Sequence, residues 1–409
     1  MPDEFVVVGA SLAGGTAAAT LREEGFDGRV ILIGEELTAP YERPPLSKEY
    51  FRGEAPFADA LVRPEDFYAS NDIETHFGVR AKRVDPIEKT IELSDADRIH
   101  YDKLLIATGS RNRRFPIPGL NLEGIYDLRT IEDCDRIKNE IIPGCRAAVV
   151  GMGFIGSEVA SSLRQMAVEV VAVEGSKFPL ARVLGEEVGH VMEHIHRDHG
   201  VQMIFEDRVS GFEGTDHVEC VVTQGGRRID CDFAVVGVGV EPVTELVTGS
   251  GIDVDNGIVV DEYCRTNIDG IFAAGDVTNH YHPVFRQRMR VEHWHNALNQ
   301  GAAAAHNMMG RASVYDEIHW FWSDQYDHNL QYTGFHREWD ELVVRGSLED
   351  RDFIAFYVKD GIVAAAVGMN RGKDVRRTMP LIRLRTVADP SQLADDDLDL
   401  RTLAGATGS

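Results

Sequence analysis

The sequence predicts an α/β protein with two parallel-sheet domains, each containing a strand–turn–helix–strand unit, and a smaller C-terminal α+β domain. Two observations predict this. A short apolar run, a Gly-rich turn and a helical stretch occur together at Gly9 and again at Gly151. Beyond residue 318 the texture changes to longer strand-like segments joined by a hairpin turn. Alternation of strands and helices in the first part is typical of parallel sheets.

The first unit predicts a strand over Phe5–Val8, a helix over Thr16–Glu24 and a strand over Arg29–Ile33. A Pro-rich loop follows at Tyr41–Ser47, and Ser47 is a good N-cap for a short helix that ends at Arg52. Lys103–Ala107 predicts a further buried strand. The stretch Arg111–Pro118 is then expected to be a linker.

The second unit repeats this order with Ala147–Val150, Ser157–Met166 and Val168–Val173 as strand, helix and strand. Further elements are predicted as strands at Phe233–Val240 and Ile271–Ala274, a helix over residues 292–309, strands over Glu341–Leu348 and within Phe353–Met369, and a helix over Arg376–Arg385. The acidic segment from Ala394 to Asp399 predicts a solvated, disordered tail. The expected domains are 1–113 with 243–317, 114–242, and 318–409.

Composition excludes several classes of partner. The 409 residues carry 42 Lys and Arg against 67 Asp and Glu, a net charge of −25, which repels nucleic acid and anionic membranes. Apolar runs are too short for a membrane span, and the acidic start predicts no signal peptide. The five cysteines are scattered, which favours reduced cytoplasmic thiols over disulfides or a metal site.

The first Gly-rich turn predicts a dinucleotide site. Gly9 permits the tight turn and Gly14 permits close packing of helix on strand, although Ser11 occupies the usual second Gly position. The helix N-terminus that follows suits a pyrophosphate. Glu35 lies just past the second strand, where a carboxylate accepts ribose hydroxyls. A Gly-rich turn without a ligand is the alternative.

The second turn is a full GxGxxG motif after a strand. Gly151, Gly153, Phe154, Ile155 and Gly156 form it, and Glu158 follows. Glu174 closes the next strand, where a carboxylate binds the ribose of NAD and repels the 2′-phosphate of NADP; Lys177 and Arg182 could soften that preference. Two dinucleotide units side by side indicate hydride transfer from a nicotinamide to a flavin.

Beyond these motifs, the sequence resembles the FAD-dependent, NADH-linked redoxin reductases, which have two Rossmann-like domains in the glutathione reductase fold. The matching segments, in order, are Tyr41–Lys48 with its PPLSK motif, Ala107-Thr108-Gly109-Ser110, the second GxGxxGxE, residues 237–242 with Gly239, residues 270–276, and Trp320–Tyr326 with its WFWSDQ motif. Together they cover residues 4–370.

The resemblance implies roles for several residues. Arg43 is expected to hold the FAD pyrophosphate and Asp276 the ribityl or pyrophosphate region, with Ala107, Thr108 and Gly109 also at FAD. The backbone at His293 and Trp294 is expected to donate to the flavin pyrimidine edge.

The catalytic candidates are Lys48 and Glu158. In the family the matching positions meet beside flavin N5, and we expect the same ion pair here, positioning the nicotinamide and balancing charge. A surface helix lysine and a dipole partner in a first helical turn are the structural alternatives. Trp320 and Trp322 share a strand face and are expected near the flavin, with interface packing as the alternative.

Residues 35–55 contain no Cys, so the expected electron acceptor is external. The resemblance implies a [2Fe–2S] ferredoxin serving a cytochrome P450 or a ring-hydroxylating oxygenase. Because the chain is acidic, a local basic patch is needed. The candidates are Arg286, Arg288, Arg290, Lys373, Arg376 and Arg377, and ordinary surface charge is the alternative for each.

Two groups of histidines carry no expected role. His190, His194, His196 and His199 are interpreted as surface residues of one helix and not as a metal site, and His280, His282, His293 and His295 bracket the expected flavin loop. Alternative functions are an NADH oxidase or small-acceptor reductase, and an NADH-responsive interaction protein like apoptosis-inducing factor. Monomer and homodimer remain equally open.

Overall fold

The structure is a computed structural model that describes residues 3–405. By its internal contacts the chain divides into two compact units. Unit 1 comprises Met1–Glu42, Phe57–Arg111 and Glu241–His319, and unit 2 comprises Arg43–Pro56, Asn112–Val240 and Trp320–Ser409. The segment Arg43–Pro56 thus groups with unit 2, and the three-domain division expected from the sequence stays a prediction.

Unit 1 is built on a parallel sheet in the order β19-β7-β1-β2-β3. Its strands are β1 (Glu4–Val8), β2 (Arg29–Gly34), β3 (Ile73–Phe77), β7 (Lys103–Ile106) and β19 (Ile271–Ala273). Alternate residues of β1 bury opposite faces: Val7 packs with the helices α1 (Leu12–Glu23) and α7 (Trp294–Met308), and Val6 packs toward the smaller sheets. Burial on both faces explains the uninterrupted apolar runs.

The smaller elements of unit 1 form two further sheets and short helical turns. The sheets are β4-β5-β6 (Ala81–Asp85, Thr90–Leu93, Arg98–His100) and β18-β20-β21 (Ile258–Val260, Thr278–His282, Gln287–Met289). The turns are η2 (Phe57–Ala60), α3 (Phe67–Ser70) and η3 (Glu245–Val247). β8 (Ser110–Asn112) and β17 (Val240–Pro242) pair where the chain passes between the units.

Unit 2 contains a second parallel sheet in the order β12-β11-β10-β16-β9. Its elements are β9 (Ile125–Tyr126), α4 (Ile131–Glu140), β10 (Arg146–Val150), α5 (Phe154–Gln165), β11 (Glu169–Val173), α6 (Ala181–Asp198), β12 (Gln202–Ile204) and β16 (Phe233–Val236). The sheet β13-β14-β15 (Val209–Glu213, Cys220–Thr223, Arg228–Asp230) covers one face of it. The turn η1 (Pro44–Ser47) and the helix α2 (Glu49–Arg52) also belong to this unit.

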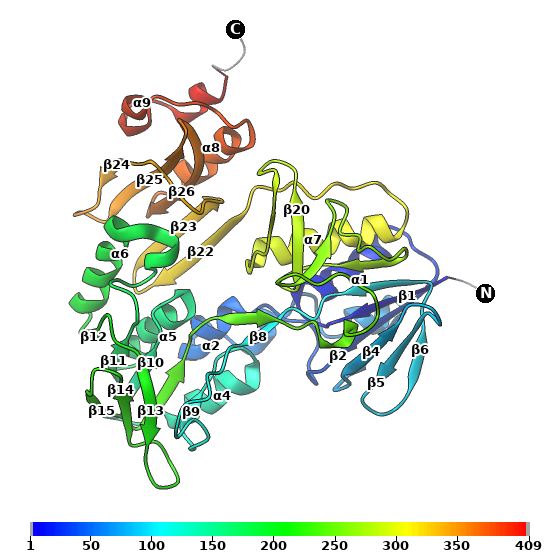
Figure 1. Ribbon diagram of the computed structural model, residues 1–409, viewed down its shortest axis with the longest axis horizontal. Helices are drawn as coiled ribbons and strands as arrows, with labels where there is room; N and C mark the ends of the chain where they lie inside the picture. The colour runs from blue at the N-terminus through cyan, green and yellow to red at the C-terminus, as the bar shows by residue number, and fades with distance from the viewer. Residues whose placement is uncertain (1–2, 406–409) are drawn as a thin grey trace. The chain divides into compact units, whose positions relative to one another are not determined.

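The C-terminal part of unit 2 is an antiparallel sheet in the order β22-β23-β26-β25-β24 (Figure 1). Its strands are β22 (Trp320–Gln325), β23 (His328–Gly334), β24 (Glu341–Ser347), β25 (Asp352–Lys359) and β26 (Ile362–Met369). The helices α8 (Gly372–Arg383) and α9 (Pro390–Ala394) and the turn η4 (Leu400–Gly405) follow. One apolar cluster joins α6 to this sheet, which places α6 against β22 and β23.

Four expectations need correction. Both fingerprint helices begin earlier than predicted, at Leu12 and Phe154. The helix α8 also begins earlier, at Gly372 and not at Arg376, because Gly372 and Lys373 already belong to its first turn. The predicted strand Phe233–Val240 is two strands, β16 and β17, because the chain turns at Gly237–Gly239. Finally, the expected disordered tail is ordered through α9 and η4.

That tail is ordered because apolar and cationic contacts fix it. Leu393, Leu400 and Leu403 are buried, and the buried Arg345 donates to the carbonyl oxygens of Gln392, Leu393 and Leu398. Arg371 also pairs with Asp396. The prediction of disorder from the acidic composition was therefore wrong, because buried leucines before and after the aspartates hold this segment in place.

Candidate functional site

The first fingerprint forms a cradle without room for side chains. Gly9 has φ +111°, and a Cβ on it would stand 2.1 Å from the carbonyl oxygen of Ala107. A Cβ on Gly14 would stand 1.8 Å from the carbonyl oxygen of Gly9. Ser11 is the N-cap residue of α1. Both positions therefore require glycine, and α1 begins directly after the turn, so that its N-terminus is the kind of place where an anion binds.

The second fingerprint repeats this geometry in unit 2. Gly151 has φ +92°, and a Cβ on Gly156 would meet the carbonyl oxygen of Gly151 at 1.9 Å. Gly153 is the N-cap of α5, and a Cβ there would meet nothing within 4 Å among the residues of 3–405. Glu174 accepts hydrogen bonds from the backbone N–H groups of Met152 and Ser176, both at 2.7 Å. Its carboxylate is thus fixed beside the Gly-rich turn, as the sequence predicted.

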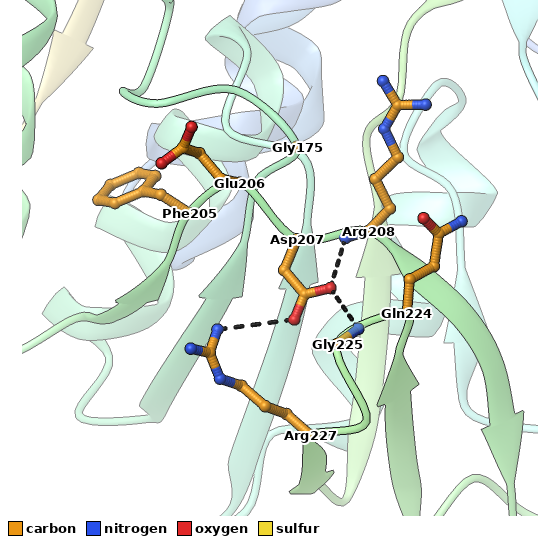
Figure 2. Close-up of a pocket in the computed structure, with 8 residues that line it drawn as sticks. All are labelled: Gly175, Phe205, Glu206, Asp207, Arg208, Gln224, Gly225 and Arg227. Atoms are coloured by element: carbon orange, nitrogen blue, oxygen red, sulfur yellow. Dashed lines mark hydrogen bonds and ion pairs between the residues drawn. The ribbon is translucent and has the colours of Figure 1, made fainter.

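An open pocket of about 470 Å³ lies at the turn that follows Glu174, with Gly175 in its wall (Figure 2). Its lining residues are Gly175, Phe205, Glu206, Asp207, Arg208, Gln224, Gly225 and Arg227. The backbone N–H of Asp207 donates to the carbonyl oxygen of Glu174 at 3.4 Å, which ties the pocket to the strand end. Sequence reasoning missed this pocket, because its walls come from three loops, which follow β11, β12 and β14.

Asp207 is the fixed point of the pocket wall. Hydrogen bonds from the Thr223 hydroxyl and from the backbone N–H groups of Gly225 and Arg208 hold the pKa of Asp207 below its usual value. The Arg208 guanidinium points away from Asp207 in Figure 2, and its stem lies within 3.2 Å of where a Cβ of Gly175 would stand. A guanidinium in this place can stack on a flat aromatic ring.

Lys48 and Glu158 form a buried ion pair in unit 2. Lys48 Nζ lies 2.6 Å from Glu158 Oε2, and the two side chains are 7% and 4% exposed. Lys48 is the residue between η1 and α2, and Glu158 lies in the second turn of α5. The structure therefore brings together the two catalytic candidates, 110 residues apart in the chain.

Two serines complete the surroundings of the Glu158 carboxylate. Ser47 Oγ donates to Oε2 at 2.5 Å, and Ser323 Oγ, on β22, donates to Oε1 at 2.7 Å. The expectation that Ser47 caps a helix is wrong: Ser47 ends η1, and Lys48 holds the N-cap position of α2. Its hydroxyl serves the carboxylate because burial makes an unsatisfied charge costly.

The WFWSDQ motif separates into two strand faces. Trp320 and Trp322 share one face, as predicted, with ring centroids 5.3 Å apart and nearly parallel rings. Phe321, Ser323 and Gln325 are buried on the other face. Phe321 contacts Phe154 of the second fingerprint edge to face at 4.7 Å. Sequence reasoning missed the inward face, although the alternation of the motif already separated it from the tryptophans.

Unit 1 places several predicted residues at the ends of its strands. Ser110 Oγ donates to Asp276 at 2.9 Å, and Thr108 Oγ1 donates to the carbonyl oxygen of Val243 at 2.7 Å. His293 is the N-cap of α7, and Trp294 is its first residue. The carboxyl ends of parallel strands are where ligands of such sheets bind.

The remaining predicted residues are placed as follows. Arg43 Nη1 donates to the carbonyl oxygen of Arg129 at 2.9 Å. Glu35, Ile155 and Arg182 are exposed, and Gly109 and Gly239 have positive φ. The exposure and backbone angles of these residues do not test their expected roles at FAD and NAD, which stay predictions.

The basic candidates differ in their surroundings. Arg288 donates to the carbonyl oxygens of Val260 and Asn279, and Arg290 pairs with Glu292, so both are committed within unit 1. Arg377 lies 3.5 Å from Asp374. Lys373 and Arg376 are exposed on α8. Exposed cations on an acidic protein are the better candidates for an acidic partner.

One histidine was misplaced by sequence reasoning. His196 is fully buried and not at the surface, because its position on α6 faces β22. Burial lowers its pKa to about 4. Within residues 3–405, no group of His, Cys, Asp and Glu has the geometry of a metal site.

The cysteines are buried, which disfavours thiol chemistry. All five cysteines lie within the described part of the chain and are free and buried. Burial raises the pKa of Cys134, Cys231 and Cys264 to about 12, which opposes thiolate chemistry. In the described residues, no helix is both long and apolar enough to span a membrane.

Comparisons with known proteins agree with this geometry. Residues 3–301 match the family described as pyridine nucleotide-disulphide oxidoreductase, and residues 320–404 match the reductase C-terminal family. Rhodocoxin reductase of Rhodococcus erythropolis is 36% identical, over 97% of this chain and 93% of its own length. The ferredoxin–NAD(+) reductase component of the anthranilate 1,2-dioxygenase system of Burkholderia cepacia is 36% identical, over 98% and 99%.

A solved structure of the covalent putidaredoxin reductase–putidaredoxin complex is similar throughout. It superposes with a TM-score of 0.96 at 32% sequence identity, covering 99% of this chain and 98% of that chain. The chain belongs to the pyridine nucleotide-disulphide oxidoreductase family, in the branch that carries a reductase C-terminal domain.

Proposed function

We propose that this protein passes electrons from NADH through FAD to a ferredoxin, in service of a cytochrome P450 or a ring-hydroxylating oxygenase. The observation that carries the proposal is the pair of glycine cradles, one in each unit, together with the buried ion pair of Lys48 and Glu158. The relatives with ferredoxin reductase names support it. Bound FAD supplies the chemistry that accepts a hydride from NADH and releases electrons singly.

The cradles fit the two cofactors. In unit 1, the turn with Gly9, Ser11 and Gly14 would hold the FAD pyrophosphate at the N-terminus of α1, and neither glycine has room for a Cβ. In unit 2, the turn with Gly151, Gly153 and Gly156 would hold the NAD pyrophosphate at the N-terminus of α5, with Gly156 packed against backbone and Gly153 beside open space. The other FAD candidates are Glu35, Arg43, Lys48, Ala107, Thr108, Gly109, Asp276, His293, Trp294, Trp320 and Trp322, and the other NAD candidates are Phe154, Ile155, Glu158, Glu174, Arg182 and Gly239. Residues 318–409 then form a separate C-terminal domain.

Glu174 and the pocket at the turn that follows it support a preference for NADH over NADPH. The fixed Glu174 carboxylate accepts ribose hydroxyls and repels a 2′-phosphate. Phe205 and the Arg208 guanidinium border the pocket beside it, where an adenine ring has an apolar wall and a cation to stack on. The two carboxylates that line the pocket, Glu206 and Asp207, are balanced by Arg208 and Arg227, so the proposed preference for NADH rests on Glu174.

Lys48 and Glu158 would position the nicotinamide and balance charge as hydride is transferred. Lys48 contributes a cation that the carboxylate keeps in place, since an unpaired ammonium would be costly at 7% exposure. The free and deeply buried cysteines support an external acceptor over an internal thiol pair.

The acceptor is a ferredoxin, and we propose one of the [2Fe–2S] type. Lys373 and Arg376 on α8 are candidates for its docking, as exposed cations on a protein of net charge −25. Free thiols at all five cysteines support a cytoplasmic location. Monomer and homodimer stay alternatives.

Stopped-flow reduction of the purified flavoprotein by NADH tests the proposal, followed by cytochrome c reduction through a panel of [2Fe–2S] ferredoxins. We expect rapid bleaching with NADH, slow bleaching with NADPH, and strong, salt-sensitive stimulation by a ferredoxin. Lys48→Met should slow bleaching at least tenfold, whereas the exposed control Lys82→Met should not. Bleaching that Lys48→Met leaves unchanged contradicts the role of the ion pair.

A further inference from the structure

We propose that Ser323, supported by Gln325 and His196, is a positioning residue that holds the Glu158 carboxylate for hydride transfer. This inference rests on the proposed function of Lys48 and Glu158. It assigns a role in the nucleotide chemistry to β22, a strand of the C-terminal sheet.

A single chain of hydrogen bonds carries the inference. His196 Nε2 lies 2.9 Å from Gln325 Oε1, Gln325 Nε2 lies 3.0 Å from Ser323 Oγ, and Ser323 Oγ lies 2.7 Å from Glu158 Oε1. At its far end, the Tyr326 hydroxyl lies 3.2 Å from His196 Nδ1. All these groups lie within unit 2.

Chemistry determines the direction of the donors along this chain. A carboxylate oxygen only accepts, so the one hydroxyl proton of Ser323 points to Glu158. Ser323 Oγ then accepts from the Gln325 amide nitrogen, which turns the amide oxygen toward His196. His196 therefore carries its proton on Nε2, and its Nδ1 accepts from the Tyr326 hydroxyl. Every link donates toward the carboxylate.

The chain works only with a neutral His196. A protonated ring would carry a hydrogen on Nδ1 as well, and it could not accept from Tyr326. Burial favours the neutral ring by lowering the pKa of His196 to about 4. The nearby His199, whose ring stacks on Tyr326 with centroids 3.6 Å apart, acts in the same direction when charged.

Because these groups are buried, the Glu158 carboxylate depends on the hydrogen bond from Ser323. Glu158, Ser323, Gln325 and His196 are 4%, 0%, 1% and 0% exposed, so water does not compensate for a lost donor. Lys48 and Ser47 both bind Oε2, which leaves Ser323 as the side-chain donor at Oε1 among the described residues. Ser323 thus sets the rotation of the carboxylate, and with it the place of the Lys48 ammonium.

The strand itself is held in register with α5. The backbone N–H of Tyr326 donates to Ser161 Oγ at 2.8 Å, one helical turn after Glu158. Together with the Ser323 contact, this ties β22 to α5 at two points on one helix face. The chain of hydrogen bonds from Tyr326 to Glu158 is therefore preorganised by the backbone and does not depend on one flexible side chain.

The test uses the holoprotein and separates positioning from stability. Ser323→Ala removes the hydroxyl, Ser323→Thr restores one, and Gln325→Met breaks the next link with little change in volume. Stopped-flow reduction across a range of NADH concentrations gives the limiting rate and the apparent Kd. Ser210→Ala is the control, because it removes a hydroxyl of unit 2 away from Glu158; Ser210 is half-buried and donates to the carbonyl oxygen of Val222.

We expect Ser323→Ala to lower the limiting rate about tenfold, equivalent to about 1.4 kcal/mol, with the apparent Kd of NADH changed less than about twofold. Gln325→Met should lower it by a smaller factor, and Ser323→Thr should restore most of it. FAD content should stay that of the wild type in every variant. The lost donor should lower the melting temperature of Ser323→Ala and Gln325→Met, but both should stay folded at the assay temperature.

Two results overturn the inference. One is a wild-type limiting rate in Ser323→Ala, and the other is an equal loss in Ser323→Ala and Ser323→Thr with normal FAD content. Either result, obtained while Lys48→Met still slows reduction, refutes the positioning role of Ser323 and leaves the proposed function standing. If the wild type is not reduced by NADH, the proposed function itself fails.

Discussion

His196 makes the stability of unit 2 sensitive to mild acid. The ring is fully buried, and burial lowers its pKa from 6.5 to about 4. The unfolded chain therefore takes up this proton at higher pH than the folded chain does. Stability from this residue is fully present above pH 6.5, falls as the pH drops, and is lost below about pH 4. At about 1.4 kcal/mol per pKa unit, the loss is about 3 kcal/mol.

Replacing His196 by Gln should remove this acid sensitivity. The Gln amide still donates to Gln325 but does not titrate. The measurement is the unfolding free energy by urea denaturation, at a series of pH values between 7 and about 4. Expressed as wild type minus variant, it should fall by about 3 kcal/mol over that range. Other buried histidines, such as His280 and His336, have lowered pKa values in both proteins and cancel in the difference.

The control is His194→Gln, the same replacement at an exposed position of the same helix. A pH dependence for His196→Gln no larger than that for His194→Gln would refute the reasoning, since it would mean that burial does not weaken proton binding by His196.

Two further predictions concern the cofactor cradle and the thiols. Gly14→Ala should abolish stable FAD binding, measured as flavin absorbance per protein, because its Cβ would stand 1.8 Å from the Gly9 carbonyl oxygen; Gly25→Asn, in open space, should retain full FAD. A normal flavin content in Gly14→Ala would contradict the close approach. The thiols of Cys134, Cys231 and Cys264 should not react with a disulfide reagent in the folded protein, since burial raises their pKa to about 12. Rapid labelling that stops ferredoxin reduction would contradict an acceptor outside the chain.

Local patterns in the sequence were sufficient for the strand–turn–helix units. Gly9 and Gly151 could be placed at tight turns because each follows an apolar run and opens a helical stretch, and both have positive φ in the structure. The strands β1 and β10 lie within one residue of their predicted bounds. Hydrophobic periodicity and Gly-rich turns are local signals, so they survive without tertiary information.

The pairing of Lys48 with Glu158 was predicted from resemblance, and the structure places the two in contact. The role of that contact stays a prediction. The sequence also placed Trp320 and Trp322 on one strand face by alternation, but the inward-facing Ser323 and Gln325 were not singled out. Alternation assigns a residue to a face, but it does not say which side chain lies opposite that face.

The sequence by itself determined the two dinucleotide-type units, the shared strand face of Trp320 and Trp322, and the family resemblance. Only the tertiary structure decided that Ser47 donates to the Glu158 carboxylate and does not cap a helix, and that His196 is buried. It also decided that Ser323 and Gln325 connect Glu158 to His196. The physical reason is distance along the chain. Ser323 and Glu158 are separated by 165 residues, and a buried polar group takes whichever partner the packing brings within about 3 Å.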